Sequence, residues 1–160
     1  MLPSIPKGYE ARMPRWEEAQ DLRSVGQAAS GRDALLAPGA ADAWVSMRLA
    51  AKQEGVALVL VSAFRSIARQ REILQSKLDA GISWTNILAA NAYPGFSEHH
   101  TGRAIDVGTP DDKGLTEAFE ATKQFRWLLS NGGRFRFYLS YPRGNPFGIS
   151  YEPWHWCFAK

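Results

Sequence analysis

The sequence has 160 residues, of which 45% are hydrophobic and 22% charged, and its formal net charge is +3. This length suits one domain that buries its own core, and the ordinary composition argues against disorder. The basic residues are scattered along the chain, so we expect no nucleic-acid partner. The single cysteine, Cys157, excludes an intrachain disulfide.

We also expect no membrane span. The longest apolar run, from Val56 to Val61, is far shorter than the roughly 20 residues that a spanning helix needs. The first residues, from Met1 to Pro6, lack the basic-then-apolar pattern of a secretory signal.

The first third of the chain favours helices. Residues 1–14 hold three prolines and predict an irregular leader. From Trp16 to about Ala29 the pattern is amphipathic and predicts a helix, with acidic residues in its first turn, where the helix dipole favours them. A second helix is expected from Ala40 to Glu54, because apolar residues recur at helical spacing and Gly55 suits the position after a helix end.

Short apolar segments and helices follow each other in the middle of the chain. Val56 to Val61 is apolar and rich in β-branched residues, which favours a buried strand. Ser66 suits the N-cap of a helix that we expect from Ile67 to Ala80. A further short helix is expected from Trp84 to Ala92, and Ala104 to Val107 predicts a short strand.

The last third combines a helix with two strands. Glu117 to Leu129 predicts a helix, and polar and apolar residues alternate from Phe135 to Leu139 as in a half-buried strand. Tyr151 to Phe158 predicts an aromatic strand that closes the chain. Because helices come first and short strands gather late, we expect an α+β fold, a single domain in which N-terminal helices pack on a small, mainly antiparallel sheet.

The three histidines of the chain lie in two segments that suit a metal site. Two of them stand in a polar loop before Asp106, and the third is His155, three residues after Glu152. A catalytic zinc ion commonly takes three ligands from such residues and keeps one position open for water. His99, Asp106 and His155 could supply this set, and Glu152 could take the proton of the water.

Each of these residues also has an explanation that needs no metal. A histidine near a glycine, such as His99, is more often a surface or capping residue. Asp106 in an apolar strand could be neutralised by an arginine, Glu152 could be exposed, and Arg65 could be a surface cation. Positions 152 and 155 would face opposite sides of a regular strand, so a shared site needs a local irregularity, which Pro153 could provide.

Together, these segments resemble the signature of the VanY-type D-alanyl-D-alanine carboxypeptidases. The matching motifs are Ser97-x-His99-x-x-Gly102-x-Ala104-x-Asp106 and Glu152-Pro153-Trp154-His155, supported by Ser62-Ala63-Phe64-Arg65-Ser66 with Gln70. The resemblance covers residues 45 to 158. We therefore expect a catalytic domain over residues 41–160 and an N-terminal extension over residues 1–40 that packs on it.

The resemblance implies a fold shared with VanX-type dipeptidases and the Hedgehog signalling domain, and Zn²⁺ as the cofactor. It also assigns roles to seven residues. These are the zinc ligands His99, Asp106 and His155, the general base Glu152, the oxyanion donor Arg65, and the substrate-binding residues Ser97 and Gln70.

The expected function is removal of the C-terminal D-alanine from peptidoglycan stem peptides, by a monomer in the cell envelope. Alternatives within the same fold are an L,D-carboxypeptidase, a dipeptidase and a phage-type peptidoglycan endopeptidase. The alternative of another class is a non-catalytic, metal-stabilised module that binds the cell wall. Such a module would need neither Glu152 nor Arg65.

Some positions depart from the family pattern. Ala63 and Phe64 replace the usual Gly and Tyr before Arg65, which removes a phenol that could hydrogen-bond to substrate. Cys157 stands where the family often has Arg, and we expect its side chain to pack in the core. The motif spacing selects His99 as the ligand, so we expect His100 to lie behind the site or at its rim.

Overall fold

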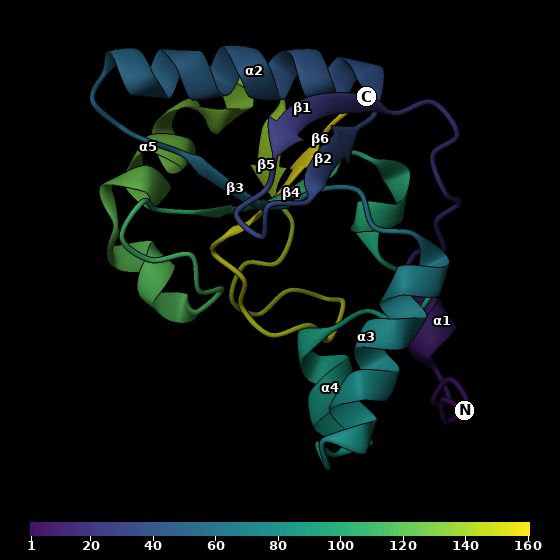
Figure 1. The fold of residues 1–160 in the computed structure, drawn as a ribbon. Coiled ribbons are helices and arrows are strands. Elements are labelled where there is room, and N and C mark those ends of the chain that lie inside the picture. The colour runs from purple at the N-terminus through teal and green to yellow at the C-terminus, as the bar shows by residue number, and fades with distance from the viewer.

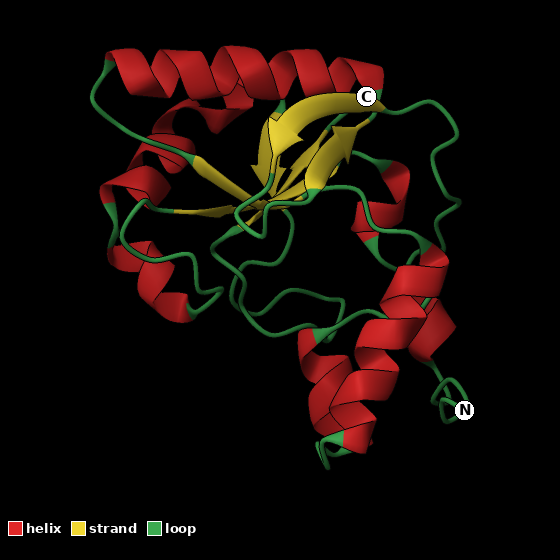
Figure 2. Cartoon of the chain, viewed as in Figure 1, coloured by secondary structure: helices red, strands yellow, loops and turns green.

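The computed structural model describes all 160 residues and contains a four-stranded sheet, a two-stranded hairpin and five α-helices (Figures 1 and 2). The strands are β1 (Arg23–Gln27), β2 (Asp33–Leu36), β3 (Val59–Ser62), β4 (Ala104–Gly108), β5 (Phe137–Leu139) and β6 (His155–Phe158). The α-helices are α1 (Tyr9–Arg12), α2 (Pro38–Gln53), α3 (Ile67–Asp79), α4 (Trp84–Ala90) and α5 (Lys123–Asn131). Three 3-10 helices complete the chain: η1 (Glu98–Thr101), η2 (Glu117–Ala121) and η3 (Gly132–Phe135). The α+β prediction is confirmed.

The larger sheet places three distant segments side by side. Its order is β3-β4-β6-β5, and each neighbouring pair is antiparallel. All five residues of β4, a central strand, are buried. In this register Asp106 on β4 pairs with His155 on β6 and, across an irregularity, with Ser62 at the end of β3.

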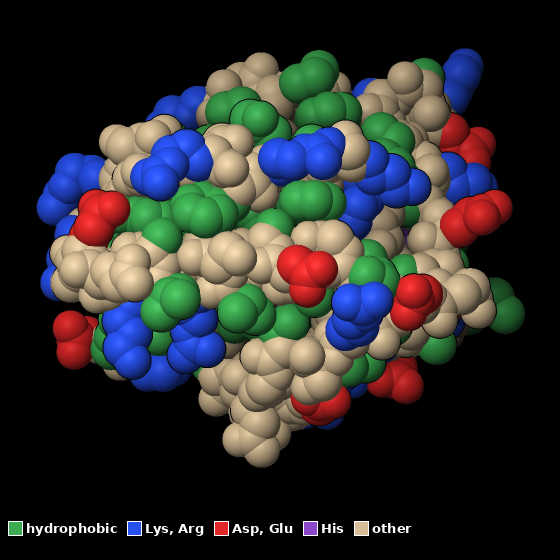
Figure 3. Space-filling model, turned by 90° about the horizontal axis from the view of Figure 1, so that it is seen from above, with side chains coloured by type: hydrophobic (Ala, Val, Ile, Leu, Met, Phe, Trp, Pro, Cys, Tyr) green, Lys and Arg blue, Asp and Glu red, His purple; other side chains and the backbone are tan.

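The larger hydrophobic core joins α2 to this sheet. In α2, Trp44 and Met47 are 1% and 0% exposed, and they share one core with β4 residues such as Ile105. Full burial of side chains of this size contributes about 1.5–3 kcal/mol each. On the outer side of α2, Val45 and Leu49 stay exposed, and the view from above shows apolar side chains there among Lys and Arg (Figure 3).

A second, smaller core joins α3 and α4 to the N-terminal segment. Leu74 of α3 and Ile87 of α4 are buried here with Phe96 and with Tyr9 of α1. The Tyr9 hydroxyl also accepts a hydrogen bond of 2.8 Å from the backbone N–H of Tyr93. These helices lie together at the lower right of Figure 1, apart from α2. The two cores leave a cleft between α3 and the large sheet, where the site lies.

One predicted helix is wrong. Residues 16 to 22 are irregular and then enter strand β1, whereas the sequence predicted a helix from Trp16 to Ala29. The backbone N–H groups of Trp16 and Ala19 donate to the carbonyls of Gly95 and His100. These long-range bonds take donors that a helix would have used, so tertiary contacts override the local pattern.

Other predicted helices and strands are shorter in the structure or divided in two. The helix expected over Glu117–Leu129 is divided at Thr122, whose side chain caps α5. Phe135 belongs to η3 instead of a strand, because Arg136 has a left-handed φ of 61° that ends the turn. Strand β3 begins at Val59 and β6 at His155, later than expected in both cases, while the predictions of α2, α3 and α4 are confirmed.

None of the helices is long and apolar enough to cross a membrane.

The division at residue 40 between an N-terminal extension and a catalytic domain stays a prediction. Residues on its N-terminal side contribute to both cores, with Leu36 in the larger and Tyr9 in the smaller.

Candidate metal and active site

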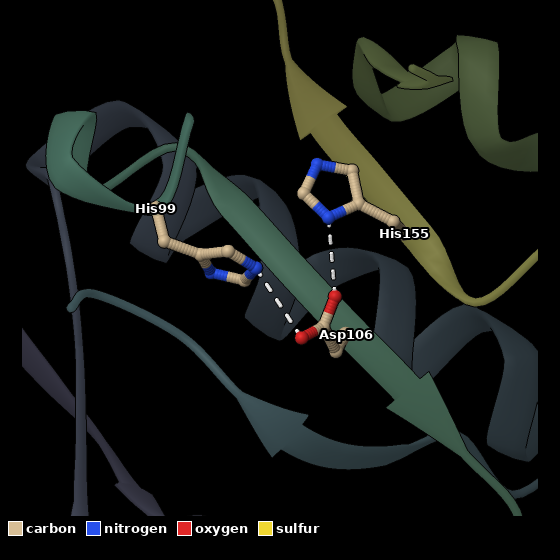
Figure 4. Close-up of side chains that lie close together, drawn as sticks. All are labelled: His99, Asp106 and His155. Atoms are coloured by element: carbon tan, nitrogen blue, oxygen red, sulfur yellow. Dashed lines mark hydrogen bonds and ion pairs between the residues drawn. The ribbon is translucent and has the colours of Figure 1, made fainter. Parts of the chain in front are cut away.

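Three side chains from three segments meet beside β4 (Figure 4). His99 comes from η1, Asp106 from β4 and His155 from β6, and each is only 3% exposed. His99 Nε2 lies 3.2 Å from Asp106 Oδ2, and His155 Nδ1 lies 3.2 Å from Asp106 Oδ1. One ligand atom from each residue lies within 4.8 Å of the other two. Ligand atoms on one tetrahedral zinc ion are roughly 3.3 Å apart, so the set can close on a metal ion with small adjustments.

The hydrogen bonds of the two imidazoles leave the correct nitrogens free for a metal. His99 Nδ1 donates to the carbonyl oxygen of Ala63 at 2.7 Å, and His155 Nε2 donates to Glu98 Oε2 at 2.8 Å. When both imidazoles are neutral, each carries one N–H, so these bonds leave lone pairs on His99 Nε2 and His155 Nδ1. Both atoms face Asp106, and the donor set therefore fits a divalent cation such as Zn²⁺.

The ionisation states of Asp106 and His99 suit a cation, whereas His155 must first lose a proton. Burial would raise the pKa of Asp106, but the two imidazoles hold that pKa well below its usual value. Burial lowers the pKa of His99. For His155, burial acts in the same direction, but hydrogen bonds to Asp106 and Glu98 outweigh it and raise the pKa to about 10. A metal ion would displace the proton that His155 carries, because only the neutral imidazole is a ligand.

The loop that carries His99 is fixed at both ends. The Ser97 hydroxyl caps η1 by accepting from the backbone N–H of His99, and Gly102 ends η1 with a left-handed φ of 67°. The carbonyl of Gly102 accepts from the Ala37 N–H at 2.8 Å, and a Cβ at Gly102 would lie 2.9 Å from that nitrogen. The close approach therefore requires glycine here.

A turn brings Glu152 and His155 to the same side. Residues 153 and 154 form a turn, in which the backbone N–H of His155 donates to the Glu152 carbonyl at 3.2 Å. Strand β6 begins only at His155, so the alternation of a strand does not separate the two side chains. This turn, which includes Pro153, is the local irregularity that a site shared by Glu152 and His155 needs.

Glu152 has the properties of a proton carrier. Its Oε2 lies 3.6 Å from His155 Nδ1, and its side chain is 12% exposed. Burial raises the pKa of Glu152 to about 7, with Asp106 adding to this effect and His155 and Arg65 opposing it. A carboxyl group with a pKa near neutrality can accept a proton and return it at neutral pH.

Arg65 is held in a fixed position beside the candidate metal ligands His99, Asp106 and His155, which we call the metal set. Its guanidinium donates to Gln70 Oε1 at 2.8 Å and to Ser62 Oγ at 3.1 Å, and lies 3.8 Å from Asp106 Oδ2. Gln70 in turn donates to the Ala92 carbonyl at 2.7 Å. Because both ends of the Gln70 amide are used within the protein, Gln70 positions Arg65 in this structure.

All seven residues predicted from the sequence line one cleft of about 250 Å³. Its remaining wall includes Lys77, Asn91 and Tyr141. The volume lies slightly below the range of about 300–1,000 Å³ that is usual for small-molecule sites, so the cleft suits one or two small residues of a peptide.

Sequence reasoning missed two residues beside His155. Glu98 accepts from His155 Nε2 and also from the Ser140 hydroxyl at 2.6 Å, while the Tyr141 ring centre lies 4.8 Å from that of His155. Glu98 stands next to His99 in the chain, but its contact with a residue 57 positions away depends on the fold. No local signal in the sequence indicated it.

His100 and Cys157 lie outside the metal set. His100 is fully buried behind the site, where Nδ1 donates to the Arg65 carbonyl at 2.6 Å and Nε2 accepts from the Gly95 N–H at 3.1 Å. It therefore braces the backbone at Arg65. Cys157 is half-buried on β6, and burial together with the nearby Glu98 carboxylate raises the pKa of its thiol.

Comparison with known proteins identifies the family. The family model described as VanY, D-alanyl-D-alanine carboxypeptidase, matches residues 33–160. The D-alanyl-D-alanine carboxypeptidase of Enterococcus faecalis (strain ATCC 700802 / V583) is 32% identical over 120 residues, which are 69% of this chain and 43% of that protein. The chain belongs to the VanY D-alanyl-D-alanine carboxypeptidase family, and it spans less than half the length of this relative.

Solved structures share the fold. The LdcB LD-carboxypeptidase matches with a TM-score of 0.78 and 32% identity, over 91% of this chain and 71% of that one. A mutant of the vancomycin resistance D,D-pentapeptidase VanY, in complex with Zn(II), matches with a TM-score of 0.68 and 25% identity, over 88% of this chain and 79% of that one.

Proposed function

We propose that this chain is a zinc-dependent carboxypeptidase that removes the C-terminal D-alanine from peptidoglycan stem peptides ending in D-Ala-D-Ala. The observation that carries the proposal is the meeting of a His–Asp–His set, a buried glutamate and a fixed arginine in one cleft. Membership of the VanY family supports the substrate class, and the related VanY structure in complex with Zn(II) supports the choice of metal.

The metal would be held by His99 Nε2, by a carboxylate oxygen of Asp106 and by His155 Nδ1. When bound, Zn²⁺ would lower the pKa of a water molecule and polarise the scissile carbonyl group. The burial of all three ligands would strengthen this effect, because nearby charges are poorly screened in a low-dielectric site.

The protein's own groups would carry the proton and the developing charge. Glu152 would take a proton from the attacking water and return it to the amine of the departing D-alanine. The Arg65 guanidinium would donate to the oxyanion of the tetrahedral intermediate, which is commonly worth about 3 kcal/mol for a well-placed donor. Ser97, which lines the cleft beside His99, would help to hold the peptide.

Digestion of a defined muropeptide with a pentapeptide stem, with products weighed by mass spectrometry, tests this function. The zinc-loaded protein should release one alanine, and Glu152→Ala should bind zinc but release none. Glu10→Ala, at an exposed glutamate outside the cleft, should behave as the wild type. The proposal fails if the zinc-loaded wild type releases no alanine, or if Glu152→Ala releases it at the wild-type rate.

An L,D-carboxypeptidase is the second candidate, because the LdcB structure resembles this chain with the higher TM-score. Including a tetrapeptide stem in the same digestion separates the two activities. Loss of alanine from the tetrapeptide alone would favour the L,D activity. A non-catalytic wall-binding module would bind both stems and cleave neither.

We also propose that the protein acts as a monomer in the cell envelope, since its substrate is part of the wall. Light scattering of the purified protein and fractionation of expressing cells would test these two points. A stable dimer, or recovery of the protein apart from the envelope fractions, would overturn them.

A further inference from the structure

Lys77 carries a charge in the cleft and forms no ion pair with an acidic group. It lies on α3, seven residues after Gln70 and hence on the same face of the helix, and it lines the cleft that contains the metal set. Its ammonium makes one hydrogen bond, of 2.8 Å, to Asn91 Oδ1. No carboxylate lies within ion-pair distance of it, whereas Arg65, Asp106 and Glu152 in the same cleft all have charged neighbours.

The environment of Lys77 disfavours an unpaired charge. Burial lowers the pKa of Lys77, and the nearby Arg65 lowers it further, with Glu152 opposing. An ammonium group has three N–H donors, and Asn91 accepts only one of them. The remaining donors and the absence of an ion pair suit an anionic ligand.

Asn91, the residue that follows α4, holds the Lys77 side chain in place. Its Nδ2 donates to the Ile87 carbonyl at 2.8 Å, which fixes the amide at the end of α4 with Oδ1 directed at Lys77. By contrast, Lys52 at the end of α2 is exposed and makes no side-chain hydrogen bond. The hydrogen bonds of Asn91 therefore fix the position of the Lys77 ammonium in the cleft wall.

We propose that Lys77, held by Asn91, binds a carboxylate of the peptide substrate. The inference rests on the proposed peptidase function and adds a specificity determinant to it. Seven helical residues span about 10 Å, and helical side chains lean toward the N-terminus, which brings the ammonium back toward Gln70 and Arg65. An extended peptide covers about 3.3–3.6 Å per residue, so the carboxylate belongs to a residue within a few positions of the scissile bond.

Two substrate groups offer this chemistry. One is the terminal carboxylate of the departing D-alanine, and the other is the side-chain carboxylate of a diaminopimelate residue in the stem. The terminal carboxylate would make the cleft selective for chain ends over internal bonds. The two sources differ in the peptides that need Lys77, so one experiment can distinguish them.

Calorimetric titration of zinc-loaded Glu152→Gln protein tests the inference without turnover. The probes are diacetyl-L-Lys-D-Ala-D-Ala, its C-terminal amide, and the corresponding diaminopimelate peptide in both forms. The same titrations are repeated with the double variant that also carries Lys77→Met. A peptide with the recognised carboxylate should bind this variant about 10- to 100-fold more weakly, which is the range for a charge-assisted hydrogen bond. Binding of peptides without that carboxylate should change less than about twofold.

The pattern of losses assigns the source. If both free-acid peptides bind more weakly and both C-terminal amides bind unchanged, Lys77 binds the terminal carboxylate. If the free acid and the amide of the diaminopimelate peptide both bind more weakly and the lysine peptides bind unchanged, Lys77 binds the side-chain carboxylate. Lys77→Arg should retain most of the affinity, and Lys52→Met should retain all of it. Equal weakening of all four peptides, or no change in any, would overturn the inference.

The two proposals fail independently. Absence of D-alanine release by the zinc-loaded wild type counts against the proposed function, whereas the titration measures only peptide affinity. A circular dichroism melt of Lys77→Met should match that of its parent, since methionine keeps most of the unbranched stem of the lysine side chain.

Discussion

At the scale of single residues, His99 and His155 each direct one ring nitrogen at Asp106 and bind an acceptor with the other. For His155 that acceptor is Glu98, whose own pKa is lowered by contacts with His155 and Ser140 that outweigh the effect of burial. An ionised carboxylate behind an imidazole fixes its ring and raises its basicity as a ligand.

Removing this carboxylate should weaken zinc binding. Glu98→Ala should raise the zinc dissociation constant about 10- to 100-fold, measured by competition with a chelating dye. Glu98→Gln should lose less, because its amide oxygen can still accept from His155 Nε2. Glu72→Ala, at an exposed glutamate of α3, serves as the control. Unchanged zinc affinity in Glu98→Ala would show that Glu98 has no part in holding the ligand.

Glu152 should make the stability of the metal-free protein depend on pH. Its pKa rises from a usual 4.5 to about 7 on folding, so its contribution to stability is complete below about 4.5 and is lost as the pH rises through 7. Glu152→Gln should therefore stabilise the metal-free protein more at pH 8 than at pH 4, by up to about 3 kcal/mol. Urea unfolding of both proteins at the two pH values measures this. An equal difference at both would contradict it.

The site could be predicted from the sequence more fully than the contacts that support it. Short motifs with characteristic spacing in the sequence contain Arg65, His99 and Glu152. All three side chains line the cleft. Glu98 and Lys77 could not be found in this way. Their environments come from Ser140, His155 and Asn91, which only the tertiary structure brings near.

At the scale of elements, periodic helices were predictable and the N-terminal segment was not. The amphipathic spacing of α2 and the serine cap of α3 are local signals, and both helices formed as expected. The segment before β1 also has helical spacing, but Trp16 and Ala19 donate to the loop that carries the histidines. Long-range pairing of this kind leaves no mark in the local pattern.

Gly102 is the element-scale position where substitution should be most costly. Gly102→Ala would combine a left-handed φ of 67° with a Cβ only 2.9 Å from backbone and side-chain atoms, so we expect a loss of roughly 2–4 kcal/mol in urea unfolding. Gly81→Ala is the matched control, since its φ is 84° with no atom near the added Cβ, and should lose about 1 kcal/mol. Equal losses would mean that the contact with Ala37 does not constrain the loop.

At the scale of the whole molecule, the site ties together segments that belong to both cores. Asp106 lies in the large sheet, whereas Gln70 and Lys77 lie on α3, which packs in the smaller core. A metal ion bound only by the folded chain should therefore stabilise the whole domain.

Zinc should raise the melting temperature. At 100 times the dissociation constant, the gain is about 2.7 kcal/mol, which corresponds to roughly 5–10 °C for a domain of this size. Scanning calorimetry with zinc and with a chelator measures the shift. His155→Ala should abolish it, and a full shift in that variant would place the metal elsewhere.

A crystal structure of the zinc-loaded protein, with the metal located by anomalous scattering, tests the central claim most directly. We predict one peak about 2.0–2.2 Å from His99 Nε2, a carboxylate oxygen of Asp106 and His155 Nδ1, with Glu98 still accepting from His155 Nε2. A peak on His100 or Cys157, or a loaded protein with no peak between these three residues, would contradict the account.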